Sequence, residues 1–351
     1  MKRIQVTASK NYEVLVGKGL LQELGIYLKA VTKAAKVAII SDSHVWPIYG
    51  QLAVKSLEDA GFNSTVSYIF PAGEESKNGE TYLSVLNFLA AEKLTRSDCI
   101  IALGGGVVGD MTGFVAATYL RGIDYIQVPT TVLAAVDSSV GGKTAIDLDS
   151  GKNLVGAFYQ PKLVLCDIDT LGTLPEDIFR DGCAEIIKYG VLYDPNLFAH
   201  LQDKTMDFDR EAVISRCIEL KRDVVAADEF DRGERQKLNL GHTIGHSIEA
   251  NSHFTISHGK AVAIGMDMVS RASAKQNLCT VETATAIENI LRGFSLPTAS
   301  NDSVDAIFEG ALSDKKRFGN TVNLIVPVEI GNCIIHSITT EELKTFIEAG
   351  L

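Results

Sequence analysis

Short apolar runs recur through the first half of the chain, and stretches with apolar residues at helical spacing lie between them. Such runs are typical of strands buried on both faces of a parallel sheet. The predicted strands are 36–40, 64–70, 99–103, 125–128 and 163–166. The predicted helices are 20–30, 46–60, 82–93 and 107–119. Weak alternation over 1–16 adds two edge strands or a hairpin, and this order predicts a doubly wound α/β domain.

The pattern changes near residue 175. From 176 to 312 almost every stretch has helical periodicity, and a predicted strand at 322–326 and a predicted helix at 340–349 follow. The 351 residues also exceed what a single hydrophobic core comfortably supports. We therefore predict two domains, an α/β domain at 1–172 and a mostly helical domain at 173–351.

Composition and charge limit the classes of function. Hydrophobic residues make up 46% of the chain and charged residues 22%, as in soluble globular proteins. No apolar run reaches the roughly 18 residues that span a bilayer, and the N-terminus lacks the apolar segment of a signal peptide. Six scattered cysteines without a CxxC pair favour reduced thiols and a cytoplasmic location. The net charge of −11 argues against nucleic acid, but it leaves an anionic small substrate open because local cations define a site.

A glycine-rich junction follows the predicted strand at 99–103. Gly104, Gly105 and Gly106 lead into a predicted helix, whose free N–H groups and positive dipole suit a phosphate. A formal match to GxGxxG is present, but it follows a later strand than in the usual dinucleotide fingerprint, so that fingerprint does not transfer. The alternative is a buried strand with ordinary turn glycines. The dense polar run at 129–144, which includes Lys143, favours the phosphate site.

Three charged residues near other strand ends have two interpretations each. Asp42 follows a strand, where an acidic side chain either binds a ribose hydroxyl or caps a helix. Glu74 and Lys77 are three residues apart, so they share a face if helical and are otherwise solvated.

Histidines and one glutamate stand out in the helical half. One continuous helix would align four polar residues of this half on a single stripe: Arg235, Asn239, His242 and His246. His242 and His246 form an HxxxH pair, which suits a metal, although an isolated pair of this kind is more often incidental.

A metal site gains support from two further positions. Glu185 lies in an apolar helical stretch, where a glutamate is costly unless it is paired or bound to a metal, and Lys188 shares its face. His258 directly precedes a predicted helix. One carboxylate with two or three imidazoles suits Zn²⁺ or a similar divalent ion.

Together these motifs resemble those of one family, the 3-dehydroquinate synthases, which are sugar-phosphate cyclases related to metal-dependent glycerol and alcohol dehydrogenases. The resemblance covers nearly the whole chain. It rests on GGGVVGD, RGIDYIQVPTTVLAAVDSSVGGKTAID, GKNLVGAFYQP, AEIIKYG, LNLGHTIGHSIE, SHGKAVAIGM and DKK, in this order.

The resemblance implies a Rossmann-like α/β domain that binds NAD, a mostly α-helical metal-binding domain, and a site in the cleft between them. The implied metal ligands, for zinc or cobalt, are Glu185, His242 and His258, with His246 as a neighbouring group. The implied cofactor residues are Asp42, Glu74, Lys77, Gly105, Gly106, Val107, Asp110, Thr130, Thr131, Lys143, Lys152 and Thr173. The implied substrate residues are Arg121, Lys143, Lys152, Asn153, Lys188, Lys221, Arg235, Asn239 and a lysine of the pair Lys315 and Lys316. The implied catalytic residues are Asp137, Lys143, Asn153, Lys188, Arg235, Asn239 and His246.

The implied reaction converts 3-deoxy-D-arabino-heptulosonate 7-phosphate into 3-dehydroquinate and phosphate, in the shikimate pathway, by a homodimeric cytoplasmic lyase. Its substrate carries a carboxylate and a phosphate, which arginine and lysine match. The alternatives are a sister cyclase that makes 2-deoxy-scyllo-inosose or an epi-valiolone, a metal-dependent polyol dehydrogenase, and an inactive nucleotide- or metal-binding module. The cation-rich motifs favour the acidic substrate over a neutral polyol, and the retained Glu185, His242, His258 and Lys188 speak against an inactive module.

Overall fold

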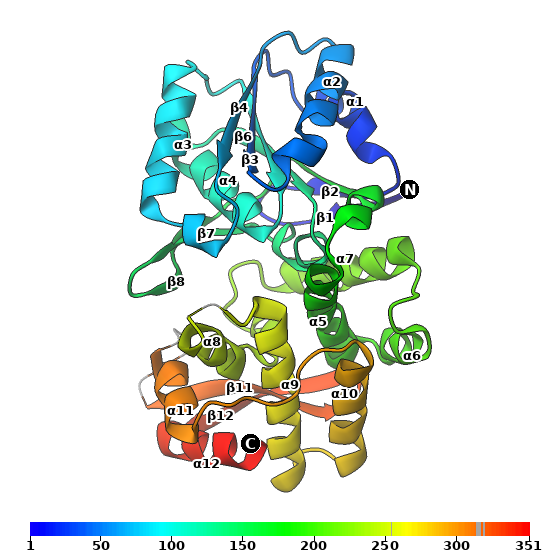
Figure 1. Ribbon diagram of the computed structural model, residues 1–351, viewed down its shortest axis with the longest axis vertical. Helices are drawn as coiled ribbons and strands as arrows, with labels where there is room; N and C mark the ends of the chain where they lie inside the picture. Colours follow the sequence, from blue (N-terminus) through cyan, green and yellow to red (C-terminus); the bar gives the residue numbers. More distant parts are fainter. Residues whose placement is uncertain (254, 314–316, 319) are drawn as a thin grey trace. The chain divides into compact units, whose positions relative to one another are not determined.

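The computed structural model describes residues 1–253, 255–313, 317–318 and 320–351 (Figure 1). The chain divides into two compact units. The first unit comprises Met1–Leu174 and Arg210–Phe230, and the second unit comprises Pro175–Asp209 and Asp231–Leu351. The sequence predicts a single boundary at 172/173, whereas the chain returns to the first unit for one helix before completing the second.

The first unit is built on a seven-stranded sheet of order β1-β2-β9-β6-β5-β3-β4. All neighbouring strands are parallel except β1 and β2, which form an antiparallel edge pair. The strands are β1 Lys2–Val6, β2 Tyr12–Gly17, β3 Val37–Asp42, β4 Thr65–Phe70, β5 Cys99–Gly104, β6 Asp124–Pro129 and β9 Leu163–Asp167. The helices are α1 Leu24–Val31, α2 Gln51–Asp59, α3 Gly79–Ala91, α4 Gly106–Thr118 and α7 Arg210–Ala227.

The centre of this sheet is apolar on both faces, which explains the uninterrupted apolar runs in the sequence. Successive residues of a strand point to opposite faces, so Ile39 joins an apolar cluster with Leu28 of α1 and Leu57 of α2. Its neighbour Ile40 joins the opposite cluster, which includes Met111 of α4. Helices therefore cover both faces of the sheet (Figure 1), and the prediction of a doubly wound α/β domain is confirmed.

The strand order places a topological switch point between β3 and β5. From β3 the chain adds β4 on one side, then returns to add β5 and β6 on the other. In open α/β sheets, ligands bind outside the carboxyl ends of the strands at such a point. Asp42 ends β3 and Gly104 ends β5, so the glycine-rich junction lies where this topology favours a ligand.

A hairpin in the first unit is absent from the sequence prediction. Strands β7 Lys143–Leu148 and β8 Gly151–Phe158 pair antiparallel as a separate two-stranded sheet. β8 is largely exposed, so it lacks the apolar run by which the buried strands are found.

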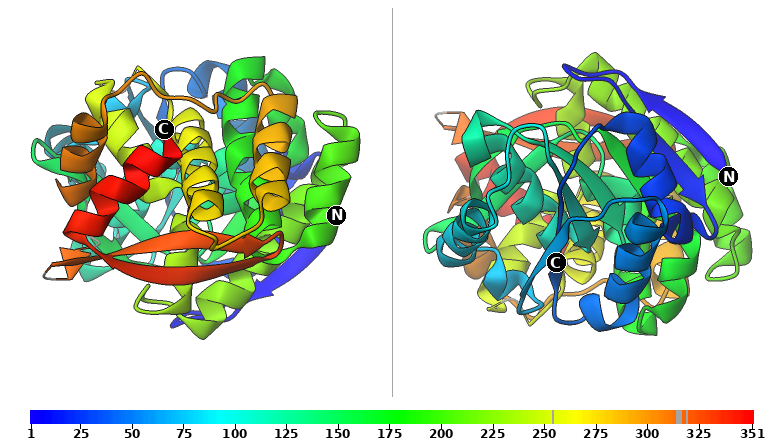
Figure 2. Two further views of the ribbon diagram at one scale, coloured as in Figure 1. Left: turned by 90° about the horizontal axis from the view of Figure 1, so that it is seen from below. Right: turned by 90° about the horizontal axis from the view of Figure 1, so that it is seen from above.

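The second unit consists mainly of helices, as predicted, with one three-stranded antiparallel sheet. The helices are α5 Glu176–Tyr193, α6 Pro195–Lys204, α8 His242–Asn251, α9 His258–Lys275, α10 Val281–Gly293, α11 Val304–Ser313 and α12 Thr340–Gly350. The strands are β10 Arg317–Phe318, β11 Thr321–Glu329 and β12 Asn332–Thr339. The sequence predicts β11 but not its partner β12, and Figure 2 shows this hairpin beside α9, α10 and α12.

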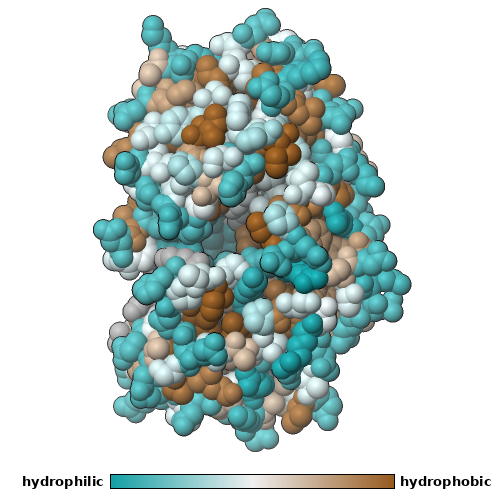
Figure 3. All heavy atoms as spheres, viewed as in Figure 1, coloured by the Kyte–Doolittle hydropathy of each residue, from teal (hydrophilic) through white to brown (hydrophobic). Residues whose placement is uncertain are grey.

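The surface of each unit and the character of the helices agree with the composition. On the face of each unit shown in Figure 3, hydrophilic side chains predominate and hydrophobic ones form small separate groups. Among the described residues, no helix combines the length and apolarity that crossing a membrane requires.

Candidate active site

Three predicted metal ligands from three helices of the second unit converge on one point. Glu185 comes from α5, His242 from the start of α8 and His258 from the start of α9. Their ligand atoms lie within 4.8 Å of one another. Glu185 Oε1 is 3.5 Å from His242 Nε2 and 3.5 Å from His258 Nε2. The structure thus brings together one carboxylate oxygen and two imidazole nitrogens.

These distances fit a tetrahedral divalent metal. With ligand bonds of about 2.1 Å, the edge between two ligands of a tetrahedral Zn²⁺ is about 3.4 Å. The charge of the cluster points the same way. Burial by itself lowers the pKa of His258, but hydrogen bonds to Glu185 and Glu249 raise it to about 10. A site that draws a proton onto an imidazole so strongly favours a cation, and a metal ion can replace that proton.

Helix α5 holds the first turn of α9 in place. Asp181, one turn before Glu185, accepts hydrogen bonds from Lys260 N at 2.9 Å and from Ser257 Oγ at 2.5 Å. A Cβ on Gly259 would lie 1.9 Å from the Asp181 carbonyl oxygen, so only glycine permits this approach. The carboxylate therefore caps α9 and fixes His258 opposite Glu185.

Glycines allow α8 and α9 to pack backbone against backbone. A Cβ on Gly265 of α9 would lie 2.0 Å from Gly241 O and 2.9 Å from Gly245 N. A Cβ on Gly245 would in turn lie 2.8 Å from Ala261 O. This close packing explains the glycines beside the histidine pair, and it leaves the rings of His242 and His258 with centroids 5.3 Å apart.

Second contacts of the two imidazoles define their orientation. His242 Nδ1 lies 3.0 Å from the Leu240 carbonyl oxygen. His258 Nδ1 lies 3.3 Å from Glu249 Oε2. His246 lies one turn after His242 on the same face of α8, and its ring centroid is 5.2 Å from that of His242. His246 is therefore adjacent to the cluster of Glu185, His242 and His258, as the resemblance implies.

Lys188 is the buried cation of this site. It is 1% exposed and forms an ion pair with Glu185 Oε2, one turn away on α5. The two carboxylate oxygens of Glu185 therefore have different neighbours: Oε1 faces the two imidazoles, and Oε2 faces Lys188. The shared helical face predicted for this pair is confirmed.

The single stripe predicted for Arg235, Asn239, His242 and His246 is wrong. Arg235 and Asn239 lie on a separate 3₁₀ helix, η7 (Glu234–Asn239), and α8 begins only at His242. Gly241 has φ +78°, a left-handed conformation that interrupts any continuous helix. Arg235 is nevertheless 1% exposed, so it is a buried guanidinium and not a solvated charge.

In the first unit, the glycine junction forms a cradle at the N-terminus of α4. A Cβ on Gly105 would lie 3.0 Å from Thr131 Cγ2, and one on Gly106 would lie 3.3 Å from Ser138 Oγ. Within the part of the chain that the structure describes, the buried hydroxyls of Thr130 and Ser138 have no hydrogen-bond partner. Orphaned hydroxyls beside free helix N–H groups fit an anionic ligand such as the pyrophosphate of NAD. Sequence reasoning assigned Thr130 and Thr131 but not Ser138.

A buried ion pair lies beside this cradle. Lys77 Nζ is 2.6 Å from Asp110 Oδ2 on α4 and 2.7 Å from Asn153 Oδ1 on β8. Burial lowers the pKa of Lys77, but the Asp110 and Glu74 carboxylates raise it above its usual value. Lys77 is 4% exposed, so the solvated interpretation is wrong for it. Glu74, on the short η3 (Glu74–Ser76), pairs instead with Lys152 Nζ at 3.1 Å.

Asp42 caps the turn at 43–45, which leads into the short helix η2 (Trp46–Gly50). Its Oδ1 accepts hydrogen bonds from His44 N and Val45 N, each at 2.8 Å. Its other carboxylate oxygen can still receive a ribose hydroxyl at the end of β3, so both interpretations of Asp42 are compatible with this geometry.

The remaining predicted residues have varied surroundings. Lys221 of α7 donates to Asp137 Oδ1 at 2.7 Å, on η5 (Ala134–Ser138). Arg121 and Lys143 are exposed. Thr173 Oγ1 lies 2.7 Å from Tyr49 Oη. Lys315 and Lys316 lie outside the described residues.

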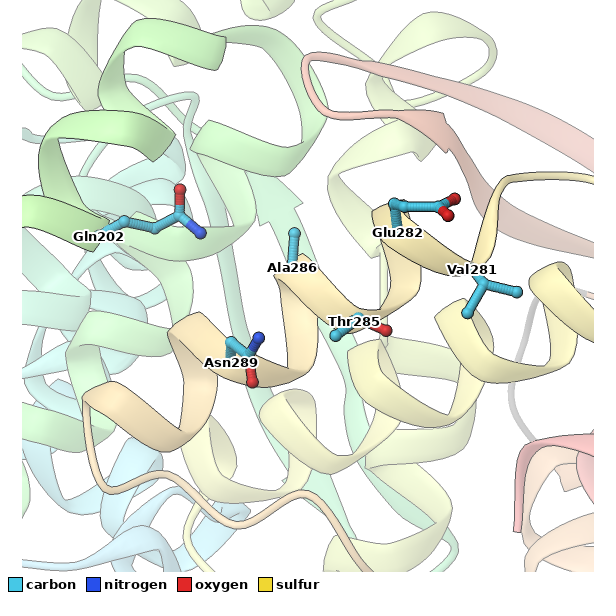
Figure 4. Close-up of a pocket in the computed structure, with 6 residues that line it drawn as sticks. All are labelled: Gln202, Val281, Glu282, Thr285, Ala286 and Asn289. Atoms are coloured by element: carbon cyan, nitrogen blue, oxygen red, sulfur yellow. The ribbon is translucent and has the colours of Figure 1, made fainter.

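A surface pocket elsewhere in the second unit does not coincide with these groups. It lies between α6 and α10 (Figure 4). Its lining residues are Gln202, Val281, Glu282, Thr285, Ala286 and Asn289. The lining offers one carboxylate and neither an imidazole nor a cation, so we assign it no role.

Comparisons with solved structures relate this geometry to known folds. The chain superposes on 2-deoxy-scyllo-inosose synthase, solved with carbaglucose-6-phosphate, NAD⁺ and Co²⁺, with a TM-score of 0.89, 26% identity and 100% coverage of both chains. An iron-containing alcohol dehydrogenase shares the fold at a TM-score of 0.68, with 15% identity and 99% coverage of both chains.

Sequence comparisons identify relatives of higher identity than these solved structures. Residues 67–181 match the family model for 3-dehydroquinate synthase N-terminal, and 182–317 match the one for 3-dehydroquinate synthase C-terminal. The 3-dehydroquinate synthase of Clostridium perfringens is 46% identical over 97% of this chain and 99% of its own. That of Clostridium acetobutylicum is 40% identical over 99% of each. On these full-length matches, the chain belongs to the 3-dehydroquinate synthase family.

Proposed function

We propose that the chain converts 3-deoxy-D-arabino-heptulosonate 7-phosphate into 3-dehydroquinate and inorganic phosphate. The observation that carries the proposal is the cluster of Glu185, His242 and His258 in a member of this family, in which the buried Glu185 Oε1 lies 3.5 Å from each imidazole Nε2. Relatives named 3-dehydroquinate synthase match the chain over nearly its whole length.

NAD and one divalent metal are the proposed cofactors. The related cyclase solved with NAD⁺ and Co²⁺ supports both. Glu185, His242 and His258 would hold the metal, and the proposed NAD residues are Asp42, Glu74, Lys77, Gly105, Gly106, Val107, Asp110, Thr130, Thr131, Lys143, Lys152 and Thr173. When bound, NAD and the metal supply transient oxidation of a substrate hydroxyl polarised by a Lewis acid, which permits phosphate β-elimination, re-reduction and intramolecular aldol closure.

Cationic and polar side chains bind and orient the substrate in this proposal. Lys188 and Arg235 are each 1% exposed, and a buried cation is costly unless it meets anionic groups. Their low exposure makes them suited to substrate oxygens that have lost their water. The other proposed substrate and catalytic residues are Arg121, Asp137, Lys143, Lys152, Asn153, Lys221, Asn239, His246 and a lysine of the pair Lys315 and Lys316.

His246 is the proposed proton carrier. Its ring lies beside those of His242 and His258 and is partly exposed, and an imidazole can both accept and donate a proton. If His246→Ala retained full turnover with the metal still bound, His246 would have no role in proton transfer.

A sister cyclase and a polyol dehydrogenase are the alternative activities. Identity to the solved 2-deoxy-scyllo-inosose synthase is 26%, against 40% and 46% to the named 3-dehydroquinate synthases. Phosphate release can be measured from the heptulosonate phosphate, from glucose 6-phosphate and from sedoheptulose 7-phosphate in parallel. Release from the first alone supports the proposal, and release from either of the others alone contradicts it.

A homodimer and a cytoplasmic location complete the proposal. Family membership supports the dimer, which light scattering after gel filtration can test; a single-chain mass would contradict it. The cysteines of the structure are free thiols, and all except Cys279 are buried, which agrees with a reducing compartment.

A further inference from the structure

We propose that Glu249 is a positioning residue, which holds the His258 imidazole in the tautomer and orientation that metal binding requires. The inference rests on the proposed function, because it concerns the same metal cluster. Glu249 lies on α8 and is 4% exposed, and sequence reasoning gave it no role. A buried carboxylate needs a partner that compensates its desolvation.

The ring of His258 lies between two carboxylates. Its Nε2 is 3.5 Å from Glu185 Oε1, and its Nδ1 is 3.3 Å from Glu249 Oε2. If Nδ1 carries the proton and donates a hydrogen bond to Glu249, the lone pair is on Nε2 and points toward Glu185 and the centre of the cluster. A carboxylate that receives the second N–H of a ligand histidine also increases the basicity of the ligand nitrogen.

His242 provides an internal comparison. Its Nδ1 lies 3.0 Å from the Leu240 carbonyl oxygen, and its Nε2 also faces Glu185 Oε1 at 3.5 Å. Both imidazoles therefore present Nε2 to the cluster and Nδ1 to an acceptor. The acceptor for His242 belongs to the backbone, whereas the acceptor for His258 is a side chain that a substitution can remove.

Helix α8 consequently serves both ligands. It carries His242 as a ligand, and two turns later it carries Glu249 as the acceptor for the ligand on α9. The glycine contacts between α8 and α9 bring the two helices close enough for this side chain to reach His258.

A second metal site is the competing explanation. The ligand atoms of His246, Glu249 and His258 also lie within 4.8 Å of one another. However, a neutral imidazole has one lone pair, so His258 cannot ligate one metal through Nε2 and another through Nδ1 without losing its last N–H proton. The geometry therefore assigns Glu249 to His258 and not to a second metal.

The test compares metal binding in Glu249→Met, Glu249→Gln and a control, Glu282→Gln, in which an exposed glutamate of α10 loses its charge. Dissociation constants for Co²⁺ are measured by chelator competition, together with the visible spectrum of bound Co²⁺ and the metal stoichiometry. We expect Glu249→Met to weaken binding by about 10- to 100-fold and to change the spectrum. Glu249→Gln should lose less, about threefold to tenfold, because its amide oxygen still accepts the Nδ1–H bond. Glu282→Gln should match the wild type.

Several results would overturn the inference. If the affinity and spectrum of Glu249→Met stay within twofold of the wild type, Glu249 does not position His258. If Glu249→Met does not fold, unchanged affinity and spectrum in Glu249→Gln overturn the inference equally. Two metal ions per wild-type chain and one per variant would assign Glu249 to a second site. The experiment needs no substrate, so failure of the proposed reaction is detected separately, as absent phosphate release from the wild type.

Discussion

A methyl group at Gly265 tests whether the close packing of α8 and α9 creates the metal cluster. The Cβ of Gly265→Ala would lie 2.0 Å from Gly241 O, about 1.4 Å short of the 3.4 Å at which ordinary contact begins. The nearest atoms belong to backbone, so no side chain can rotate away. The helices must separate, and His242, which directly follows Gly241, must move with its segment.

The expected magnitude follows from two opposing terms. Overpacking of this kind costs about 1–3 kcal/mol. Alanine regains about 1 kcal/mol over glycine within a helix. We therefore expect Gly265→Ala to lower the free energy of unfolding by up to about 2 kcal/mol. The metal should be affected more, because a ligand displaced by more than about 0.5 Å leaves the productive geometry. We expect the Co²⁺ affinity to fall at least about tenfold.

The assay separates these two effects. Urea unfolding in EDTA gives the free energy of unfolding of the metal-free protein, and chelator competition gives the Co²⁺ affinity. Gly293→Ala on α10 is the matched control, because the nearest atom to its Cβ is Thr205 Cγ2 at 3.8 Å. This control should leave the affinity unchanged and stabilise the protein by up to about 1 kcal/mol. A Gly265→Ala variant with wild-type stability and affinity would refute the reasoning.

Three further predictions concern charged groups. Glu185→Gln should lower the affinity for Zn²⁺ or Co²⁺ at least about tenfold, because it removes the anionic ligand and leaves Lys188 buried without its carboxylate. Chelator competition measures this affinity, and an unchanged value would exclude Glu185 as a ligand. Lys77→Met should lower the free energy of unfolding, measured in urea, by about 3 kcal/mol because it leaves Asp110 without its buried cation, and it should weaken NAD⁺ binding in calorimetry. Lys55→Met, which breaks the exposed pair of Lys55 and Asp59, is the control and should cost less than about 1 kcal/mol. Burial raises the pKa of Asp267 to about 6, so the folded state favours its neutral form. Relative to Asp267→Asn, the wild type should therefore lose on the order of 3 kcal/mol in free energy of unfolding as the pH rises from 4 to above 6. Parallel dependence of the unfolding free energy on pH in the two proteins would contradict this.

The elements that the sequence predicts best are those with one dominant physical cause. β3 and β5 are buried along their whole length, so uninterrupted apolar runs reveal them. β8 is mostly exposed and β12 is buried at few positions, so neither leaves such a run. The location of the glycine junction at a switch point depends on strand order, which no local pattern contains.

The site shows a similar division. Residue patterns alone placed Glu185, His242, His246 and His258 in one candidate metal site and left open whether two or three imidazoles belong to it. The family resemblance selected Glu185, His242 and His258, and the structure brings these three together. The false single stripe arose because residue spacing does not show the left-handed turn at Gly241. Glu249 was missed because its partner, His258, lies on a different helix, so the contact depends on tertiary packing.

The proposed reaction uses NAD without consuming it. The most direct measurement incubates the wild-type protein with 3-deoxy-D-arabino-heptulosonate 7-phosphate, NAD⁺ and Zn²⁺ or Co²⁺, and follows inorganic phosphate and absorbance at 340 nm together. We expect many equivalents of phosphate per NAD⁺ with no net NADH, and we expect EDTA to abolish turnover. Stoichiometric NADH without phosphate would contradict this expectation and assign the chain a dehydrogenase activity.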